Sequence, residues 1–451
     1  MILRRKWVII SPVRNALFLL SFFLLRLIFA LPALKEPDLA IRINPDASLY
    51  QELGINMSRH DVFSGVSSPP YRPEGLRTPL YPLMVAVSDR LIGDTVRPVI
   101  ILQALLWALT AFILLLFAEK RYGFAAGLIT ALLVLISPVS LKYGPALMSE
   151  NLFVPVLVVA GLVFLRASES GSTRLFALSG LLFGLSALVR PSSLPLGVML
   201  VFLVGRPLLK RGLVFAGLWA APVGFWVIRN WLSFGFPFFS TAFSLNIVAQ
   251  NAPRVIAAAD GISLEEAEGR VRQDIRERYG ADESWFYDPH YLNVMLPYGL
   301  EIIKKHPKEY VVLHAKGVLM CFLPSDPGSL GVSLGLWREL SLDPFGLINQ
   351  AMVKPSEAKR LLREAFGMMG LGEFILFAFI SLYTLALYGL AVAGTMRLRR
   401  EKALLSVCFI TIGVLVFMAG LLGSPRFRLP AEPFLALLAG GALLSRRRDG
   451  R

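Results

Sequence analysis

Long apolar runs separated by short polar or basic stretches make up most of the chain. The segment 16–34 contains one charged residue, Arg26, and the segments 99–118 and 374–396 contain none. An α-helix needs about 20 such residues to cross the roughly 30 Å hydrocarbon core of a bilayer. Further apolar runs of helical length occupy residues 124–141, 151–165, 175–189, 191–205, 212–228, 403–424 and 429–445. The pattern predicts an all-α polytopic membrane protein with about 10 transmembrane helices, and at most roughly 13.

Composition agrees with this prediction and excludes several other classes of protein. Hydrophobic residues make up 55% of the 451 residues and charged residues 17%, whereas a soluble domain of this length would carry more charge. The cysteines Cys321 and Cys408 are far apart in apolar surroundings, and the four histidines lack the spacing of metal ligands. The basic start "MILRRKW" is typical of a signal peptide, but Arg26 and the length of the first run favour a retained first span.

The basic residues, which give the chain a net charge of +15, predict its orientation in the membrane. They concentrate in alternate connections between the apolar runs, at 4–14, 120–121, 166–174, 206–211, 397–402 and 446–451. The opposite short connections contain Lys142, Arg190, Arg426 and Arg428. Because Lys and Arg accumulate on the cytoplasmic side, we expect both termini to be cytoplasmic, in a multi-pass protein of the cell (inner or plasma) membrane. The positive charge therefore indicates topology, and we expect no nucleic-acid partner.

Two hydrophilic regions, 35–96 and 230–372, are predicted to face the extracytoplasmic side and to carry surface helices. They divide the chain into three parts. We expect an N-terminal transmembrane module, 1–229, whose first outer loop is 35–96. The extracytoplasmic region 230–372 follows, and a C-terminal transmembrane module, 373–451, completes the chain.

Two short patterns predict helices inside the second hydrophilic region. Ser263 stands three residues before Glu266, which is the spacing of a capping box at a helix N-terminus. The apolar segment 309–323 would, as a lone crossing, place the basic run 397–402 outside. We therefore expect 309–323 to be an external helix along the membrane or half of a re-entrant pair.

Polar residues that could carry chemistry gather on the predicted outer face. Asp46 and Tyr50 are four residues apart in the first outer loop, so they would share one face of a helix. Asp46 could instead merely cap the helix that begins there. Other candidates on the same face are Arg77 before the second span, Lys142, Tyr143 and Glu150 in the second outer loop, Arg190 in the third, Arg229 and Asn230 after the seventh span, and Arg426 and Arg428 in the last turn.

Cations at the edge of the hydrocarbon are costly unless they are paired or used. Each arginine could instead extend to the lipid headgroups. Taken together, the cations beside the carboxylates Asp46 and Glu150 predict a site for an anionic substrate carried by the membrane.

The order of several segments resembles that of the GT-C glycosyltransferases, closest to the branch with protein O-mannosyltransferases and lipid A aminoarabinose transferases. The segments are "DASLY", "LRTPLYPL", "LMSENLF", "GLSALVRPSSLPL", "PVGFWVIRNWLSFG" and "SPRFRLPAEPFLALLAG". The resemblance covers the seven N-terminal spans, the last outer turn and the final span. It implies a GT-C-like fold, a polyprenyl-phosphate-linked sugar as donor, and transfer to a lipid, glycan or protein acceptor on the extracytoplasmic side.

The resemblance also implies roles for individual residues. Asp46 would occupy the family's first-loop acidic position, which is usually assigned as the base, and Glu150 the second-loop acidic position. Arg77 matches a basic residue before proline that touches the donor phosphate in the aminoarabinose branch, where lysine directly precedes the proline; here Thr78 intervenes. The residue after Asp46 is Ala47 rather than a second acid, which departs from the protein-mannosylating subgroup.

These residue types suit transfer of a sugar from a lipid phosphate. The leaving phosphate gains negative charge, so it needs cations, with Arg77 as first choice and Arg426 or Arg428 as second. Asp46 would take the proton of an acceptor hydroxyl, and direct displacement would invert the anomeric centre. Glu150 would orient the acceptor or bind a divalent metal ion, although the sequence requires no cofactor. We expect substrate contacts from Tyr50, Lys142, Tyr143, Arg190, Arg229 and Asn230, with packing as the alternative role for Tyr50.

Two other functions stay open at this point. A membrane transporter or flippase for lipid-linked sugars would place ionisable groups near the middle of the bilayer, and Arg26 is a weak sign of this. A sugar-polymer polymerase or ligase of a different membrane fold would use a lipid-linked oligosaccharide as its donor.

Overall fold

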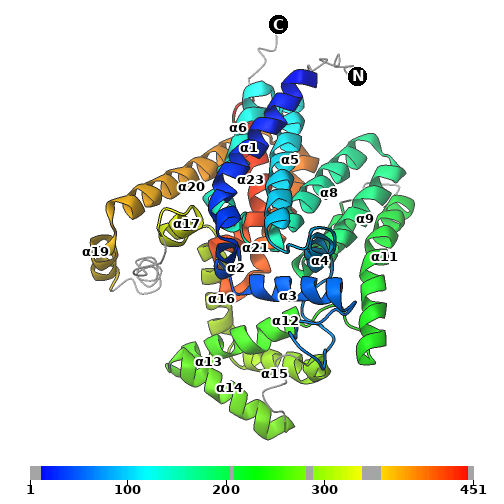
Figure 1. The fold of residues 1–451 in the computed structure, drawn as a ribbon, viewed down its shortest axis with the longest axis vertical. Coiled ribbons are helices and arrows are strands. Elements are labelled where there is room, and N and C mark those ends of the chain that lie inside the picture. Colours follow the sequence, from blue (N-terminus) through cyan, green and yellow to red (C-terminus); the bar gives the residue numbers. More distant parts are fainter. Residues whose placement is uncertain (1–11, 204–207, 281–287, 338–356, 445–451) are drawn as a thin grey trace.

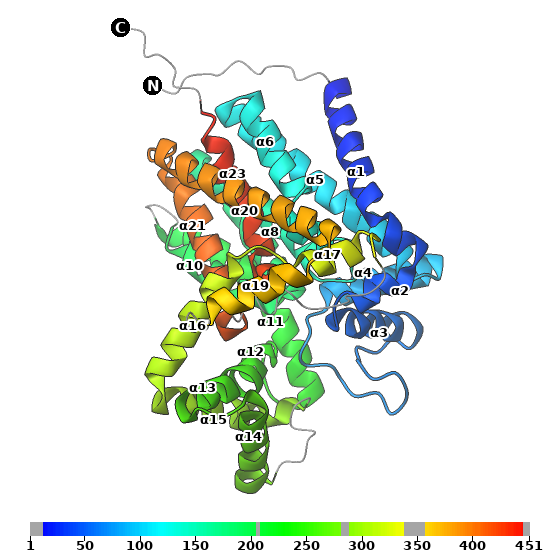
Figure 2. The same cartoon turned by 90° about the vertical axis from the view of Figure 1, so that its left-hand side faces the viewer.

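The computed structural model describes residues 12–203, 208–280, 288–337 and 357–444, and within these ranges it consists of helices and loops without a strand. Of the basic terminal residues in the orientation argument, Arg14 is described, and those of 4–6 and 446–451 lie outside the described residues, as do 204–207, 281–287 and 338–356. Most of the long helices gather in one part of the molecule, and the helices α12 to α15 lie at the end away from the start of α1 (Figures 1 and 2). The all-helical expectation is confirmed for the described residues.

The apolar helices of the two predicted transmembrane modules pack into one body. The first module consists of α1 (Pro12–Lys35), α5 (Arg97–Tyr122), α6 (Phe124–Leu135), α8 (Glu150–Ser170), α9 (Thr173–Val189), α10 (Leu194–Val201) and α11 (Leu208–Phe234). The second consists of α20 (Leu371–Arg397), α21 (Lys402–Phe417) and α23 (Glu432–Gly441). Helix α23 contacts both α20 and α6, and it is buried along its whole length.

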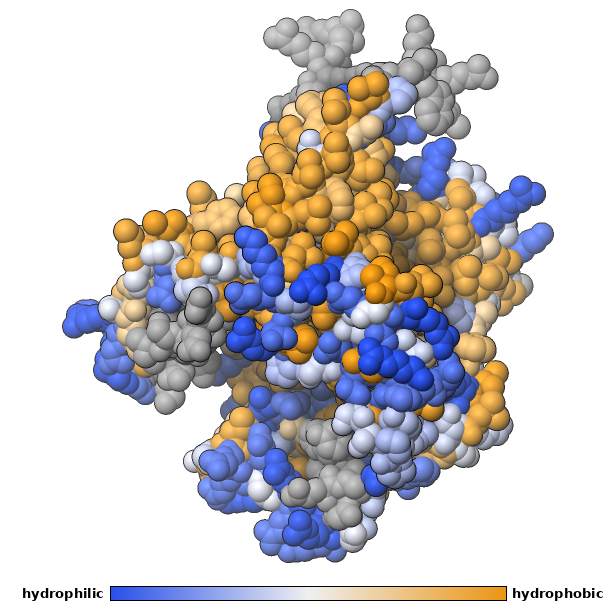
Figure 3. Space-filling view, viewed as in Figure 1, coloured by the Kyte–Doolittle hydropathy of each residue, from blue (hydrophilic) through white to orange (hydrophobic). Residues whose placement is uncertain are grey.

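Every apolar run of the sequence overlaps at least one helix in the described residues, but the helices differ in length. Five are long and apolar enough to cross a membrane: α1, α5, α8, residues 210–234 of α11, and α20. Shorter apolar helices cover 124–135, 173–189, 191–201 and 402–417. Apolar side chains cover the surface around these helices, and polar ones the opposite end (Figure 3). These helices are those of a membrane protein, and the number of about 10 crossings stays a prediction.

The predicted span 124–141 is broken, and a buried charge fastens the break. Helix α6 ends at Leu135, and the short α7 (Pro138–Tyr143) follows. The Arg26 side chain, 3% exposed, donates hydrogen bonds of 3.1 Å to the Leu135 carbonyl and 2.9 Å to the Ser140 carbonyl, and it stacks over Trp107. The Leu135 carbonyl freed by the break thus finds a partner, as buried backbone groups in a membrane require.

The first outer region contains α2 (Pro37–Arg42), α3 (Asp46–Arg59) and α4 (Leu80–Ile92). Helices α3 and α4 lie side by side because Gly54 has no side chain, since a Cβ there would be 2.4 Å from Val85 Cγ1. The buried Asn56 amide donates to the Ser64 and Val66 carbonyls and fixes the loop that leads towards Arg77. The start of α3 and this loop thereby face the same space.

The second outer region is a group of helices below the membrane-type helices (Figure 2). It contains α12 (Ala242–Leu245), a π-helical turn (Asn246–Asn251), α13 (Ala252–Asp260), α14 (Leu264–Tyr279), α15 (Leu292–Lys305) and α16 (Pro307–Cys321), and beyond it α17 (Pro327–Ser333) and α19 (Ala358–Met368). The Ser263 hydroxyl accepts from the Glu266 N–H at the start of α14, so the predicted N-terminus is confirmed.

The doubtful segment 309–323 is one helix, α16, that connects the outer region with the last turn of the chain. It contacts α13 at one end and the turn around Gly420 and Arg426 at the other. The two backbones touch because residue 317 is glycine, where a Cβ would lie 2.1 Å from the Gly420 carbonyl oxygen. Helix α16 thus brings outer-region side chains to the turn that carries Arg426.

Candidate active site

A cavity of about 690 Å³ lies between the outer helices and the ends of the apolar helices. Its walls come from segments far apart in the chain: the start of α3, the loop before α4, the start of α8, the turn after α9, the α12–α13 region, α16, and the residues from the end of α21 to the start of α23. Its charged lining residues are Asp46, Arg77, Glu150, Arg190 and Arg426.

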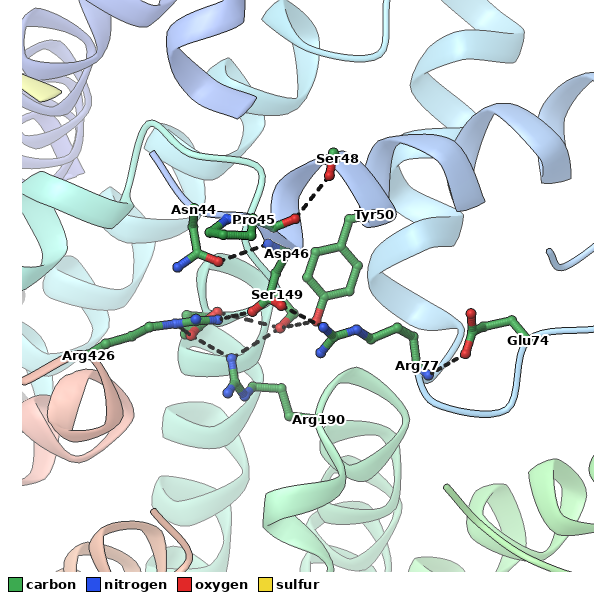
Figure 4. A network of polar contacts seen from close by, with 11 residues as sticks. Asn44, Pro45, Asp46, Ser48, Tyr50, Glu74, Arg77, Ser149, Arg190 and Arg426 are labelled. Atoms are coloured by element: carbon green, nitrogen blue, oxygen red, sulfur yellow. Dashed lines mark hydrogen bonds and ion pairs between the residues drawn. The ribbon is translucent and has the colours of Figure 1, made fainter. Parts of the chain in front are cut away.

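Asp46 lies at the centre of the charged wall (Figure 4). It is the first residue of α3, and its own N–H is capped by the Asn44 side chain. Its two carboxylate oxygens accept hydrogen bonds from different arginines, Arg77 Nη2 at 2.6 Å and Arg426 Nη2 at 2.7 Å. The reading of Asp46 as a mere helix cap is therefore wrong for this structure.

Two arginines keep Asp46 ionised. Burial by itself would raise the pKa of Asp46, but the positive charges of Arg77 and Arg426 and the hydrogen bond from Arg426 outweigh burial and hold that pKa below its ordinary value. The carboxylate is therefore a weaker proton acceptor while both cations remain its partners.

Glu150, the first residue of α8, is the second carboxylate of the cavity and is 1% exposed. Its Oε1 lies 2.7 Å from Arg426 Nε and 2.6 Å from Arg190 Nη1. Arg426 therefore bridges Glu150 and Asp46 with a single guanidinium. Three guanidinium groups face two carboxylates across this wall, which leaves one net positive charge.

Tyr50 and Ser149 support this network from behind. The Tyr50 hydroxyl donates to Ser149 Oγ at 2.9 Å, and Arg190 Nη1 donates to the same oxygen at 3.2 Å. The Arg77 guanidinium carbon lies 5.3 Å from the Tyr50 ring centroid. The ring of Tyr81 packs against the Tyr50 ring edge to face, with the two centroids 4.9 Å apart. Tyr50 thus both lines the cavity and packs against Tyr81. Sequence reasoning missed Ser149, whose only signal was its place next to Glu150.

Four other predicted residues surround the network without lining the cavity. Tyr143 lies between Lys142 and Arg426, with ring-to-cation distances of 5.0 and 5.9 Å. Arg229 donates to the Glu74 carbonyl at 3.0 Å, and the buried Asn230 amide donates to the carbonyls of Phe238 and Phe239. Arg229 thus connects the end of α11 to the loop before Arg77. Asn230 connects it to the segment of Phe239, which lines the cavity.

Arg428 does not reach the cavity, contrary to the expectation that it could bind the donor phosphate. Its guanidinium is 1% exposed and binds Glu432 at 2.9 Å, the Cys321 and Leu323 carbonyls, and the Tyr388 hydroxyl. Residues two apart on a helix point to different sides, and Arg426 and Arg428 share the short helix α22 (Pro425–Arg428). Arg428 therefore anchors the turn from which Arg426 enters the cavity.

The rest of the cavity wall carries no charged residue. It contains polar and aromatic side chains that sequence reasoning did not single out, among them Asn246, Asn251, Tyr310, His314 and Phe417. The first four belong to the region 230–372, in which the sequence resembles the GT-C family least. Among the described residues, no group of three or more His, Cys, Asp or Glu side chains is placed to hold a metal ion.

Comparison with known proteins bears on the part of the chain that carries most of the charged wall. Residues 76–234 match the family described as dolichyl-phosphate-mannose-protein mannosyltransferase. The match includes Arg77, Glu150 and Arg190, and it ends before Arg426 and begins after Asp46. No curated protein matches the chain. Residues 76–234 are therefore similar to the dolichyl-phosphate-mannose-protein mannosyltransferase family, whose model is a GT-C superfamily glycosyltransferase domain.

Proposed function

We propose that this protein transfers a sugar from a polyprenyl-phosphate-linked donor to an extracytoplasmic acceptor, by inverting displacement with Asp46 as base. The observation that carries the proposal is the cavity in which Asp46 lies between Arg77 and Arg426, beside Glu150 and Arg190. The family match supports a glycosyltransferase over a protein of another class.

The charge balance of the wall supports a phosphodiester as the anionic part of the donor. Three guanidinium groups and two carboxylates leave one positive charge, which a singly charged sugar phosphodiester would neutralise. Apolar residues such as Val189, Leu194 and Leu415 line the same cavity and offer a place for the lipid chain. We assign the first phosphate contact to Arg77 because its Nε is buried without a hydrogen-bond partner among the described residues.

Donor binding would also release the base. The phosphate competes with Asp46 for Arg77 and Arg426, and a carboxylate that loses cationic partners becomes a stronger proton acceptor. The acceptor hydroxyl then gives its proton to Asp46 while its oxygen bonds to the anomeric carbon. The bond to the phosphate oxygen breaks, and polyprenyl phosphate leaves with the electron pair, stabilised by the arginines through roughly 3 kcal/mol of preorganised electrostatics.

Glu150 has a different role in this scheme. Its carboxylate holds Arg426 and Arg190 in place and is itself 1% exposed. We propose that Glu150 orients these cations and, through them, the reacting groups, rather than removing a proton.

The cavity would face the extracytoplasmic side of the cell membrane. Its outer wall belongs to the helices at the end of the molecule opposite to the start of α1 and the end of α23 (Figure 2). This arrangement supports the proposed cytoplasmic location of both termini.

The test is a transfer assay with the purified protein in lipid nanodiscs. Polyprenyl-phosphate hexoses, including the mannose form, are mixed with membrane lipid, polysaccharide and peptide fractions, and products are read by mass. A gain of one sugar mass on one fraction is expected. If the protein instead moves lipid-linked sugar across liposome membranes without changing its linkage, it is a flippase. The carbonyl-bound Arg26 gives no support to such a route.

A further inference from the structure

The uncharged part of the cavity is built by a helix with an irregular turn. Residues 242–260 run through α12, a π-helical turn at Asn246–Asn251, and α13 without leaving helical geometry. π-Helical turns are rare and often occur at functional sites. Hydrogen bonds in a π-helix join residues five apart, and Asn246 and Asn251 are separated by this interval and both line the cavity.

Asn251 lines the cavity, and its amide has no protein partner among the described residues. The residue as a whole is 6% exposed. Its amide atoms are not among the fully buried unpaired atoms of the described residues, so they are accessible from the cavity. Polar groups of a protein wall pair with water or with a ligand. An unpaired amide at the wall of an open cavity therefore points to a ligand that offers both a donor and an acceptor.

Aromatic rings from two other elements complete this part of the wall. Tyr310 and His314 are one turn apart on α16, with ring centroids 5.5 Å apart, and His314 lies 4.6 Å from Phe417 at the end of α21. Burial lowers the pKa of His314, so its ring is neutral at physiological pH. All charged lining residues of the cavity belong to the Asp46–Glu150 network instead.

Amides together with aromatic faces suit one class of ligand. Side-chain amides pair with neighbouring hydroxyls as donor and acceptor at once, and aromatic rings cover the apolar C–H face of a sugar. An anion or a cation would lose its hydration here without gaining a charged partner.

We propose that Asn246, Asn251, Tyr310, His314 and Phe417 form a subsite, the amide–aromatic subsite, for a neutral sugar ring bearing free hydroxyls. The proposal rests on the proposed function, because it places that ring in the same cavity as the acid that activates a hydroxyl. The ring belongs either to the acceptor or to the sugar of the donor, and both have the same chemistry at this wall.

The test measures sugar binding to the full chain in nanodiscs. Saturation-transfer NMR with a methyl hexopyranoside, including the mannoside, reads contact with the ring protons. Asn251→Leu keeps the size of the side chain and removes its hydrogen bonds, so we expect roughly fivefold weaker binding. Asn246→Leu, at a more exposed position of the same turn, is expected to act in the same direction with less risk to folding. Asn293→Leu, an exposed asparagine on α15, is the matched control and is expected to bind like the unaltered protein.

A second arm identifies the source of the ring. Addition of a polyprenyl-phosphate hexose displaces the methyl hexoside if the subsite holds the donor's sugar, and leaves it bound if the subsite holds the acceptor. Sugar binding that is equal in Asn251→Leu, Asn246→Leu and the control overturns the proposal. The proposal is also overturned if a serine-containing peptide binds more strongly than the hexosides and the same two variants weaken binding of that peptide.

The same preparation separates this proposal from the proposed function. Absence of transfer from every polyprenyl-phosphate hexose, with sugar binding still lost in Asn251→Leu, rejects the proposed function and keeps the subsite. Transfer with an unchanged KM for donor and acceptor in Asn251→Leu rejects the subsite and keeps the proposed function.

Discussion

One guanidinium, that of Arg426, joins the two acids of the cavity. It donates from Nε to Glu150 and from Nη2 to Asp46, both at 2.7 Å, and Arg77 holds the other oxygen of Asp46. Charges in such a network depend on one another, because removal of one partner leaves another buried charge uncompensated. A substitution of a charged residue in the cavity should therefore be compared with removal of the same type of side chain at an exposed surface position.

Asp46→Asn should lower the rate of sugar transfer by roughly 10² to 10⁴-fold, because the amide keeps the shape but cannot take the acceptor's proton. The measurement is product formation by mass at saturating donor. Asp61→Asn removes a carboxylate that is 81% exposed and pairs with Arg90 at the surface, and it should transfer at the normal rate. Full activity of Asp46→Asn would reject Asp46 as the base.

Arg77→Ala should weaken donor use more than acceptor use, since the guanidinium contacts the donor phosphate in our scheme. Loss of a charge-assisted hydrogen bond corresponds to roughly a tenfold rise in the KM for the donor. Arg90→Ala, which removes an exposed guanidinium 59% accessible to solvent, serves as the control. An unchanged dependence of the rate on donor concentration would contradict the assignment.

The lowered pKa of Asp46 predicts a pH dependence of stability. A carboxyl whose pKa is depressed on folding stabilises the native state above its unfolded pKa, and this stabilisation is lost as the pH falls through the folded pKa. The ordinary value is 3.8 and the native value lies below it. The difference in melting temperature between the unaltered protein and Asp46→Asn should therefore be present at pH 6 and shrink below about pH 4. A constant difference across this range would mean that Asp46 is not paired as described.

At the scale of elements, the break between α6 and α7 shows that one continuous apolar run can fold into two separate helices. The apolar run 124–141 predicts one continuous span, and the run contains Pro138, which favours a helix start. Whether the break is tolerable depends on Arg26, a residue more than a hundred positions earlier that donates to the Leu135 carbonyl freed at the end of α6. No local pattern contains that pairing.

Arg26→Met should therefore destabilise the protein by about 2 kcal/mol, because it leaves the Leu135 carbonyl unpaired, while the Ser140 carbonyl keeps the Gly144 N–H as donor. Thermal unfolding in detergent measures this loss. Leu24→Met, a change at a position 49% exposed on the outside of the same helix, should have little effect. A loss of transport without a loss of stability would instead assign Arg26 to a transport route.

At the scale of the whole molecule, the cavity lies at the end of the helical body opposite to the start of α1 and the end of α23, which makes the orientation testable. Gln273→Cys on α14 should react with a membrane-impermeant maleimide in intact cells, whereas Arg174→Cys at the start of α9 should react only after permeabilisation. Both positions are exposed, and the native Cys321 and Cys408 are buried. The reverse labelling pattern would place the cavity on the cytoplasmic side.

The sequence by itself determined the helical membrane class and most of the charged wall. Apolar runs report directly on burial in lipid or protein, and Asp46, Arg77, Glu150, Arg190 and Arg426 stand out because charge at the membrane edge needs a reason. The tertiary structure decided which charges meet. It turned Arg428 away into a pair with Glu432, and it brought Asn251 of a π-helical turn and His314 of α16 to the same cavity. Which of these side chains enters the cavity depends on how helices from separate parts of the chain pack, and local sequence patterns do not contain that information.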